Sequence, residues 1–189
     1  MNFRLVTAGV SLLALGAIAS QATAATTLIY GEAGPNRGAR AEALQWFADE
    51  VENRSEGDLN FNIQWGGALF KSAAALQSIS DGVADTGTII GVYYPQEMSV
   101  YGIADLPLAN PDAWVGMKAT DEFMRNNATA RQDLANKNLV YIGTFTTSAV
   151  HIGCRGDAIR TIEDIKGKKV RGTALTAKYS ASLVRPWST

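Results

Sequence analysis

The sequence predicts an α/β fold in which a parallel-rich sheet is flanked by helices. Two observations carry this prediction. Short runs with strand character alternate with amphipathic helical stretches from residue 26 onward, and glycine-containing turns separate them. Strands and helices that alternate at this spacing form βαβ units, and right-handed crossovers place the helices on both faces of the sheet.

The first βαβ unit shows the pattern most clearly. A strand is expected over 26–31, "TTLIYG", followed by an amphipathic helix from residue 39 that ends at Gly57. Residues 59–65, "LNFNIQW", alternate apolar and polar side chains, which is typical of a half-buried strand. The apolar face of the helix is formed by residues at helical spacing: Leu44, Phe47 and Val51.

Further elements follow with less regular patterns. A second helix is expected over 70–82 and a third strand over 84–91. Asn110 is expected to cap a helix that begins with Pro111, because proline suits the first helical position. Residues 139–154 have the pattern of one long strand or two.

The charged segment "TIEDIKGKKVRG", residues 161–172, combines a turn signal with a strand signal. Thr161 followed by Asp164 resembles a capping box, and Gly167 can supply the left-handed residue that ends a short helix. In the strand expected after it, Lys169 and Arg171 share one side. The segment therefore either presents Arg171 at a strand end or forms a solvated charge cluster.

The N-terminus, residues 1–24, has the features of a secretory signal peptide. Arg4 precedes an apolar run, and "ATA" at 22–24 is a small-residue cleavage site. The apolar run is shorter than the roughly 20 residues that span a bilayer. An uncleaved membrane anchor is the alternative interpretation.

Charge and residue counts exclude several functional classes. The formal net charge of −1 gives no broadly basic surface, so no nucleic-acid partner is expected. Cys154 is the single cysteine and His151 the single histidine, so an internal disulfide is impossible and a zinc site is not expected. No cofactor is expected either.

Four segments, taken in order, resemble one known family. They are "ALQWFADEVENRSEGDLNFNIQWGGAL", "LQSISDGVADTG", "YGIADLPLANPDAW" and "IRTIEDIKGKKVRG". Together they resemble the periplasmic solute-binding proteins of TRAP transporters, the DctP family. The last segment resembles the family's "KGlKiR" signature most strongly.

The resemblance implies a periplasmic-binding-protein-like fold with two lobes that close around a small organic acid. The family delivers that acid to the membrane permease subunits of a TRAP transporter, so the resemblance implies a periplasmic binding protein and not an enzyme. We expect a first α/β lobe at 25–150 and the start of a second at 151–189. Because family members continue beyond this point, we expect the second lobe to be largely missing.

The resemblance also assigns Arg171 to the carboxylate of the ligand. The planar guanidinium can hold both carboxylate oxygens at once, which a lysine cannot do. Some family members use a second arginine on the preceding strand, and here His151 or Arg155 could occupy that role. Cys154 would then point the other way, into the core.

Four further residues are expected to lie near the ligand. The loop after the first strand carries Glu32, and the loop after the third carries Tyr93 and Tyr94. Ligands of open α/β sheets bind beyond the carboxyl ends of strands. Phe145 lies near the position where family members place an aromatic ring under the ligand.

Alternative functions remain open from the sequence. An exported α/β enzyme would need a nucleophile, a base and an orienting group, and no such arrangement is recognisable around His151. A ligand sensor that signals to a membrane receptor would use the same fold. A truncated fragment without function is the third alternative.

Overall fold

The structure is a computed structural model that describes residues 24–106, 112–146, 151, 153–156 and 158–173. The predicted signal peptide therefore lies almost entirely outside the described residues. The strands and helices of the described residues are β1 Thr26–Gly31, α1 Ala39–Arg54, β2 Leu59–Gln64, α2 Ala75–Ser80, β3 Thr86–Gly87, α3 Ala113–Asn126 and α4 Ala128–Ala135. Short 3₁₀ turns lie at Ser72–Ala74, Gly91–Tyr93, Tyr101–Asp105 and Glu163–Ile165.

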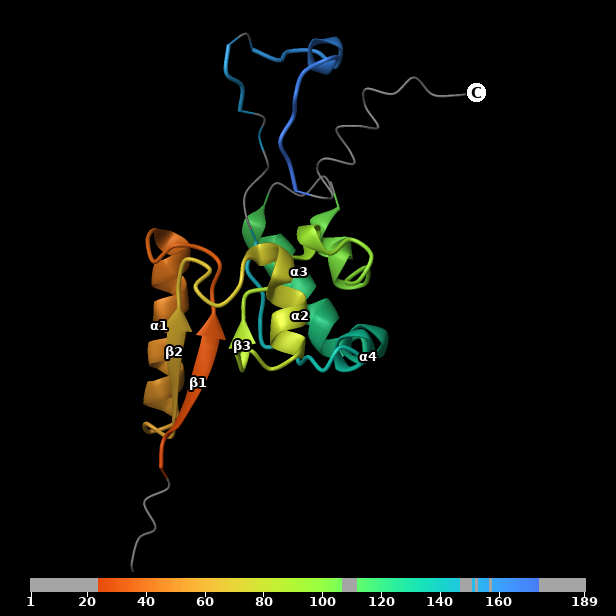
Figure 1. The fold of residues 1–189 in the computed structure, drawn as a ribbon. Helices are drawn as coiled ribbons and strands as arrows, with labels where there is room; N and C mark the ends of the chain where they lie inside the picture. The colour runs from red at the N-terminus through yellow and green to blue at the C-terminus, as the bar shows by residue number, and fades with distance from the viewer. Residues whose placement is uncertain (1–23, 107–111, 147–150, 152, 157, 174–189) are drawn as a thin grey trace, which may run out of the picture.

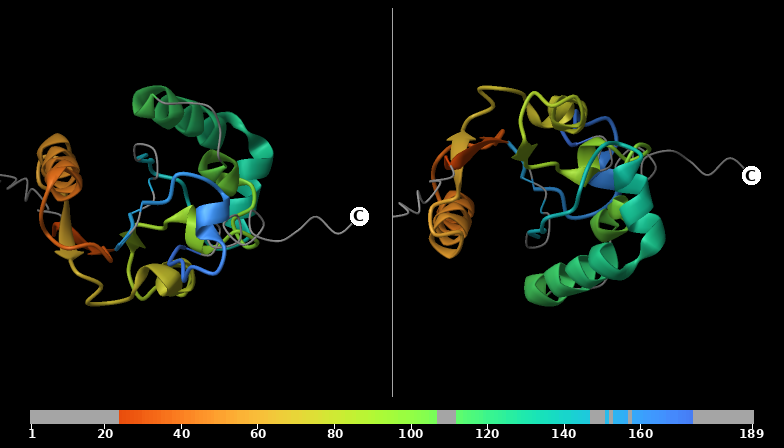
Figure 2. Two further views of the ribbon diagram at one scale, coloured as in Figure 1. Left: turned by 90° about the horizontal axis from the view of Figure 1, so that it is seen from above. Right: turned by 90° about the horizontal axis from the view of Figure 1, so that it is seen from below.

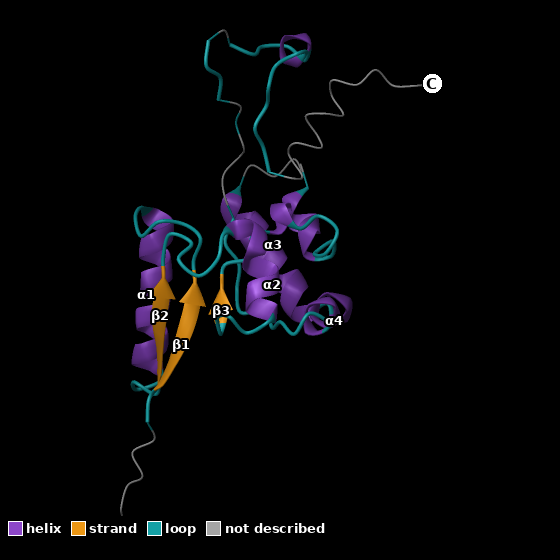
Figure 3. Cartoon of the chain, viewed as in Figure 1, coloured by secondary structure: helices purple, strands orange, loops and turns teal. Residues whose placement is uncertain are grey.

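The three strands form a parallel sheet with the order β2-β1-β3. β1 pairs with β2 along its whole length, from Thr26 opposite Leu59 to Gly31 opposite Gln64. All three strands point the same way (Figures 1 and 3). Their carboxyl ends therefore meet at one end of the sheet, which is the end where ligands of such folds bind.

The helices cover both faces of this sheet. α1 lies on one face and α2 on the opposite face when the sheet is seen end-on (Figure 2). This is the arrangement that right-handed crossovers from β1 to β2 and from β2 to β3 produce. On the α1 face, the Phe61 ring of β2 packs against Phe47 of α1 at a centroid distance of 5.7 Å and edge-on against Tyr30 at 6.2 Å.

The hydrophobic core lies between α2, α3 and α4 and the turns that follow β3. Met124 and Ala130 are its most enclosed members, with 1% and 0% of their surface exposed. The residues that build this cluster are Leu76, Tyr94, Met98, Met124, Ala130 and Leu134. A second cluster of Phe70, Ala75, Ile79 and Ala84 packs where α2 meets the sheet.

Two of the strand predictions are wrong in extent. β3 comprises Thr86 and Gly87 only, and residues 139–146 run without strand pairing. A cavity of about 320 Å³ is lined by both β3 and residues 138–143. An apolar run indicates burial, but a strand also needs a neighbour within hydrogen-bonding distance. Residues 147–150, within the same predicted strand, lie outside the described residues.

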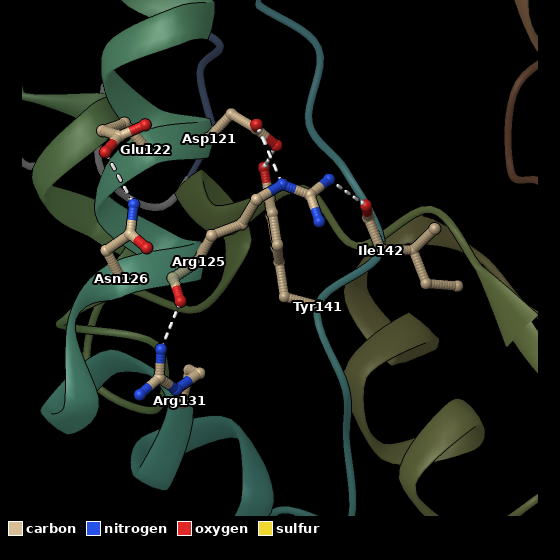
Figure 4. Close-up of polar contacts among 7 residues, drawn as sticks. All are labelled: Asp121, Glu122, Arg125, Asn126, Arg131, Tyr141 and Ile142. Carbon is tan, nitrogen blue, oxygen red and sulfur yellow. Dashed lines mark hydrogen bonds and ion pairs between the residues drawn. The ribbon is translucent and has the colours of Figure 1, made fainter.

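Side chains of α3 bond Tyr141 and Ile142, in the segment where the prediction placed a strand (Figure 4). Arg125 bonds Asp121 Oδ2 at 2.9 Å and donates to the Ile142 carbonyl at 2.7 Å. The Tyr141 hydroxyl donates to Asp121 Oδ1 at 3.0 Å, and the Arg125 guanidinium lies 5.4 Å from the centre of the Tyr141 ring. Burial is the main cause that raises the pKa of Tyr141, and the hydrogen bond to Asp121 raises it further, so the hydroxyl keeps its proton and donates.

The cap of α3 differs from the prediction. Asp112 occupies the N-cap position, and its Oδ1 accepts from the backbone N–H of Trp114 at 2.9 Å and of Val115 at 3.3 Å. Asn110 and Pro111 lie outside the described residues. A carboxylate also suits the positive end of the helix dipole, which explains why Asp112 can replace the predicted cap.

The segment that carries Arg171 is only partly as predicted. Asp164 Oδ2 accepts from the backbone N–H of Thr161 at 2.9 Å, which is one of the two bonds of the predicted capping box, and Gly167 has the expected positive φ of 74°. The helix is a single 3₁₀ turn, Glu163–Ile165. The strand predicted after Gly167 is wrong, because residues 168–173 form no regular element.

The predicted division into lobes at residue 150 stays a prediction. Residues 153–156 and 158–173 extend beyond the end of the sheet at which the strands terminate (Figure 1). Among the helices that the structure describes, none has the length and apolar character needed to cross a membrane.

Replacing Gly31 by alanine tests the close packing at the end of β1. A Cβ at this position would overlap the ring of Phe70, which is 6% exposed. We expect Gly31→Ala to lower the free energy of unfolding by about 1–3 kcal/mol in urea denaturation. Gly102→Ala is the matched control, because a Cβ there meets nothing within 4 Å. Equal effects of the two substitutions would contradict this packing.

Candidate functional site

The candidate site begins with a buried carboxylate at the end of β1. Glu32 directly follows β1, and its side chain is 2% exposed. Its backbone N–H donates to the Gln64 carbonyl at 3.0 Å, and its carbonyl accepts from the Gly67 N–H at 3.0 Å. The sheet pairing thus continues past β1 and fixes where the side chain begins.

Every side-chain oxygen of Glu32 has a partner. Oε1 accepts from the Gly34 N–H at 2.5 Å and pairs with Arg40 Nη2 at 3.0 Å. Oε2 accepts from the Thr88 hydroxyl at 2.6 Å. A buried carboxylate needs such partners, because moving it out of water without them costs several kcal/mol.

Arg40 reaches Glu32 from the first turn of α1. The chain between them, "AGPNRGA", folds so that Gly34 lies against the guanidinium. A Cβ at position 34 would overlap Arg40 Nη2 and lie 2.9 Å from Glu32 Oε1. A side chain at position 34 would therefore displace the guanidinium from this geometry.

Thr88 links Glu32 to β1 through a short relay of hydroxyl groups. Thr88 has one hydroxyl proton, which it donates to Glu32, so the Tyr30 hydroxyl donates to Thr88 Oγ1 at 2.9 Å. Burial is the main cause that raises the pKa of Tyr30, and the nearby Glu32 carboxylate adds to it. Tyr30 therefore keeps the proton that the relay requires.

Phe145 joins this group from a distant part of the sequence. The Arg40 guanidinium lies 5.7 Å from the centre of the Phe145 ring, within the range of a cation–π contact. The Phe145 side chain is 43% exposed. Phe145 is positioned by the Tyr101–Thr144 hydroxyl bond of 2.9 Å beside it. Two predicted site residues, Glu32 and Phe145, are thus brought together by Arg40.

The two tyrosines after β3 have different environments. Tyr93 ends the 3₁₀ turn Gly91–Tyr93 and is 37% exposed, so it remains available to a ligand. Tyr94 is buried, accepts from the Leu76 N–H at 3.1 Å and donates to the Ser72 carbonyl. Tyr94 therefore stabilises α2 and does not face a cleft as predicted.

Arg171, Arg155 and His151 all lie in the segment 151–173 and are exposed. Within the described part of the chain, no hydrogen bond or ion pair joins them to Glu32 or Arg40. Their assignment to a ligand site stays a prediction. Cys154 is exposed, so its predicted place in the core is wrong. The prediction depended on a regular strand, which the structure does not form.

Sequence reasoning missed Arg40 and Thr88. The available signal was an acid and an arginine on either side of a glycine-rich loop, Glu32 and Arg40 in "GEAGPNRGAR". Among the described residues, no group of three or more His, Cys, Asp or Glu side chains is arranged to hold a metal ion. The half-exposed Arg40 guanidinium beside the Phe145 ring can bind a polar or anionic group.

Comparison with known proteins gives these residues a context. The family model for bacterial extracellular solute-binding proteins of family 7, DctP, matches residues 30–182. The chain belongs to this family. The matched region of the DctP family includes Glu32, Arg40, Phe145 and Arg171.

Solved structures show the same fold. A marine metagenome TRAP solute-binding protein specific for aromatic acids, in complex with 3-hydroxybenzoate, has a TM-score of 0.74 at 21% identity over 85% of this chain and 50% of that protein. A TRAP solute-binding protein from Desulfovibrio salexigens has a TM-score of 0.64 at 20% identity over 83% and 48%. DctP7, a Bordetella pertussis receptor that binds pyroglutamic acid, has a TM-score of 0.65 at 17% identity over 84% and 52%.

These similarities confirm the predicted periplasmic-binding-protein-like fold class with a parallel sheet and flanking helices. The chain spans about half the length of each of the three proteins. The DctP family and these structures are solute-binding proteins or receptors and not enzymes, so the exported-enzyme alternative has no support.

Removing the Thr88 hydroxyl tests the polar network. Thr88→Val leaves Glu32 Oε2 buried without a donor and the Tyr30 hydroxyl without its acceptor. We expect the free energy of unfolding to fall by about 1–3 kcal/mol in urea denaturation. Thr27→Val is the control, because Thr27 is exposed in β1 and valine suits a strand. An unchanged stability of Thr88→Val would show that Glu32 does not need this bond.

The turn before Arg171 should respond to acid. The backbone N–H groups of Arg160 and then Thr161 lower the pKa of the Asp164 carboxyl below 3.8. Because the folded pKa is depressed, the stabilisation is present above the unfolded pKa and is lost as pH falls through the folded pKa. An NMR titration should show the Asp164 midpoint below 3.8 and the amide shifts of 160–165 changing with it. Asp164→Asn should remove that coupled change, whereas a midpoint at or above 3.8 would contradict the cap.

Proposed function

We propose that this chain binds a small organic acid outside the cytoplasm and delivers it to a TRAP-type membrane permease. The observation that carries the proposal is the DctP family match over residues 30–182, which contains the complete "TIEDIKGKKVRG" motif. Similar structures have names that report binding of 3-hydroxybenzoate and pyroglutamate, and both are carboxylic acids. A carboxylate is the chemical feature that these ligands share.

Arg171 is the residue that we propose to hold this carboxylate. Its guanidinium is exposed and lies beyond a turn that is fixed by Asp164 and Gly167. A guanidinium can bind both oxygens of a carboxylate in parallel, and each hydrogen bond to a charged group contributes about 1.5–3 kcal/mol. A fully exposed ion pair contributes less, so tight binding requires that water be excluded around Arg171.

The remaining assignments follow from the same proposal. Residues 25–150 would form one lobe and 151–189 would begin the other, so that a bound acid lies between Arg171 and the end of the sheet. Arg155, His151 and Tyr93 would contribute contacts from the two sides. The family is extracellular, and we propose that residues 1–24 direct export to the periplasm and are then removed.

Thermal unfolding with and without ligand tests the role of Arg171. Benzoate or pyroglutamate at about 100 times its Kd should stabilise the protein by about 2.7 kcal/mol through mass action. Arg171→Ala should abolish this shift, and Arg171→Lys should reduce it, because lysine keeps the charge but not the planar fork.

Arg160→Ala is the matched control, since it removes an exposed arginine from the same segment. We expect its ligand-induced shift to equal that of the unmodified chain. An unchanged shift in Arg171→Ala would remove Arg171 from the site, and the absence of any shift with organic acids would remove the proposed function.

A further inference from the structure

Arg40 is accessible to a ligand, whereas Glu32 is not. The Glu32 side chain is 2% exposed, and both of its oxygens are already bonded within the protein. The Arg40 side chain is 38% exposed although it pairs with Glu32. A ligand at this end of the sheet can therefore reach Arg40 and not the carboxylate behind it.

Arg40 also has hydrogen-bonding capacity to spare. A guanidinium carries five N–H donors on three nitrogens and no acceptor. The pair with Glu32 uses Nη2, and within the described residues no acceptor pairs with Nε or Nη1 of Arg40. These donors can bind an acceptor from outside the chain.

The surrounding residues hold the guanidinium in one orientation. Gly34 leaves just enough room for Nη2 beside Glu32, and Thr88 fixes the other oxygen of Glu32. The Phe145 ring, 5.7 Å from the guanidinium carbon, provides an apolar surface beside it. A donor that is fixed before binding loses little entropy when the ligand arrives, which favours affinity.

The position of Arg40 matches that of a ligand site. Arg40 pairs with Glu32, which follows the carboxyl end of β1, and Glu32 in turn accepts from Thr88, which follows β3. This is the end of the sheet at which ligands of this fold class bind. Residues 158–173, which carry Arg171, extend beyond the same end (Figure 1).

We propose that Arg40 and Phe145 form a second contact that selects organic acids carrying a hydrogen-bond acceptor in addition to the carboxylate held by Arg171. A hydroxyl, keto or second carboxylate group would accept from Arg40, and the apolar body of the acid would lie against Phe145. An ammonium group would be repelled. Glu32 acts as a positioning residue. This inference rests on the proposed function and names its substrate class.

Isothermal titration with two acids that differ by one acceptor tests the inference. 3-Hydroxybenzoate has a phenolic oxygen that benzoate lacks. In the full chain, Arg40→Gln should weaken binding of 3-hydroxybenzoate about tenfold or more, as expected for one hydrogen bond to a charged group, and change binding of benzoate less than about twofold. Arg37→Gln, an exposed arginine of the same loop, should change neither.

A second variant separates binding from folding. Arg40→Gln leaves Glu32 buried without its ion-pair partner, which can destabilise the fold. The double variant Glu32→Gln, Arg40→Gln removes both charges, and we expect it to fold and to show the same loss of discrimination between the two acids.

The outcomes distinguish this inference from the proposed function. Equal weakening of both acids, or of neither, in folded Arg40 variants would overturn the inference while Arg171→Ala still abolished binding of both. If the folded, unmodified chain bound no organic acid, the proposed function and the inference would both be overturned.

Discussion

The burial of the Glu32 carboxylate is the constraint on which the arrangement of the site depends. A carboxylate out of water must be surrounded by donors. Here they come from three separate segments: the loop at Gly34, the first turn of α1 at Arg40, and the chain after β3 at Thr88. One side chain thus ties β1, α1 and β3 together at the end of the sheet, and the same bonds orient the guanidinium that faces outward.

The fold could be predicted from the sequence where local patterns determine it. The helix around Leu44 and Phe47 follows from apolar periodicity, and β1 and β2 follow from strand patterns that pair with each other along their full length. Prediction failed for 84–91 and 139–146, because a strand exists only with a neighbour in register. The sequence shows their apolar character but not the cavity of about 320 Å³ that both segments line.

The site shows the same division between local and long-range information. The bond from Thr161 to Asp164 spans three residues and was predictable from their types. Glu32 was expected to face the ligand, but its side chain is buried against Arg40 and Thr88, which no local pattern connects to it. The contact between Arg40 and Phe145 joins residues far apart in the sequence, so only the folded chain reveals it.

The attachment of residues 139–144 to α3 has a consequence for how the protein responds to its surroundings. A backbone ladder is nearly indifferent to dissolved electrolyte, whereas the Arg125–Asp121 pair, with side chains 52% and 30% exposed, is screened by it. The same two side chains bond Tyr141 and Ile142, in the segment that ends at Phe145. At high ionic strength this attachment to α3 would therefore weaken before the backbone pairing of the sheet does.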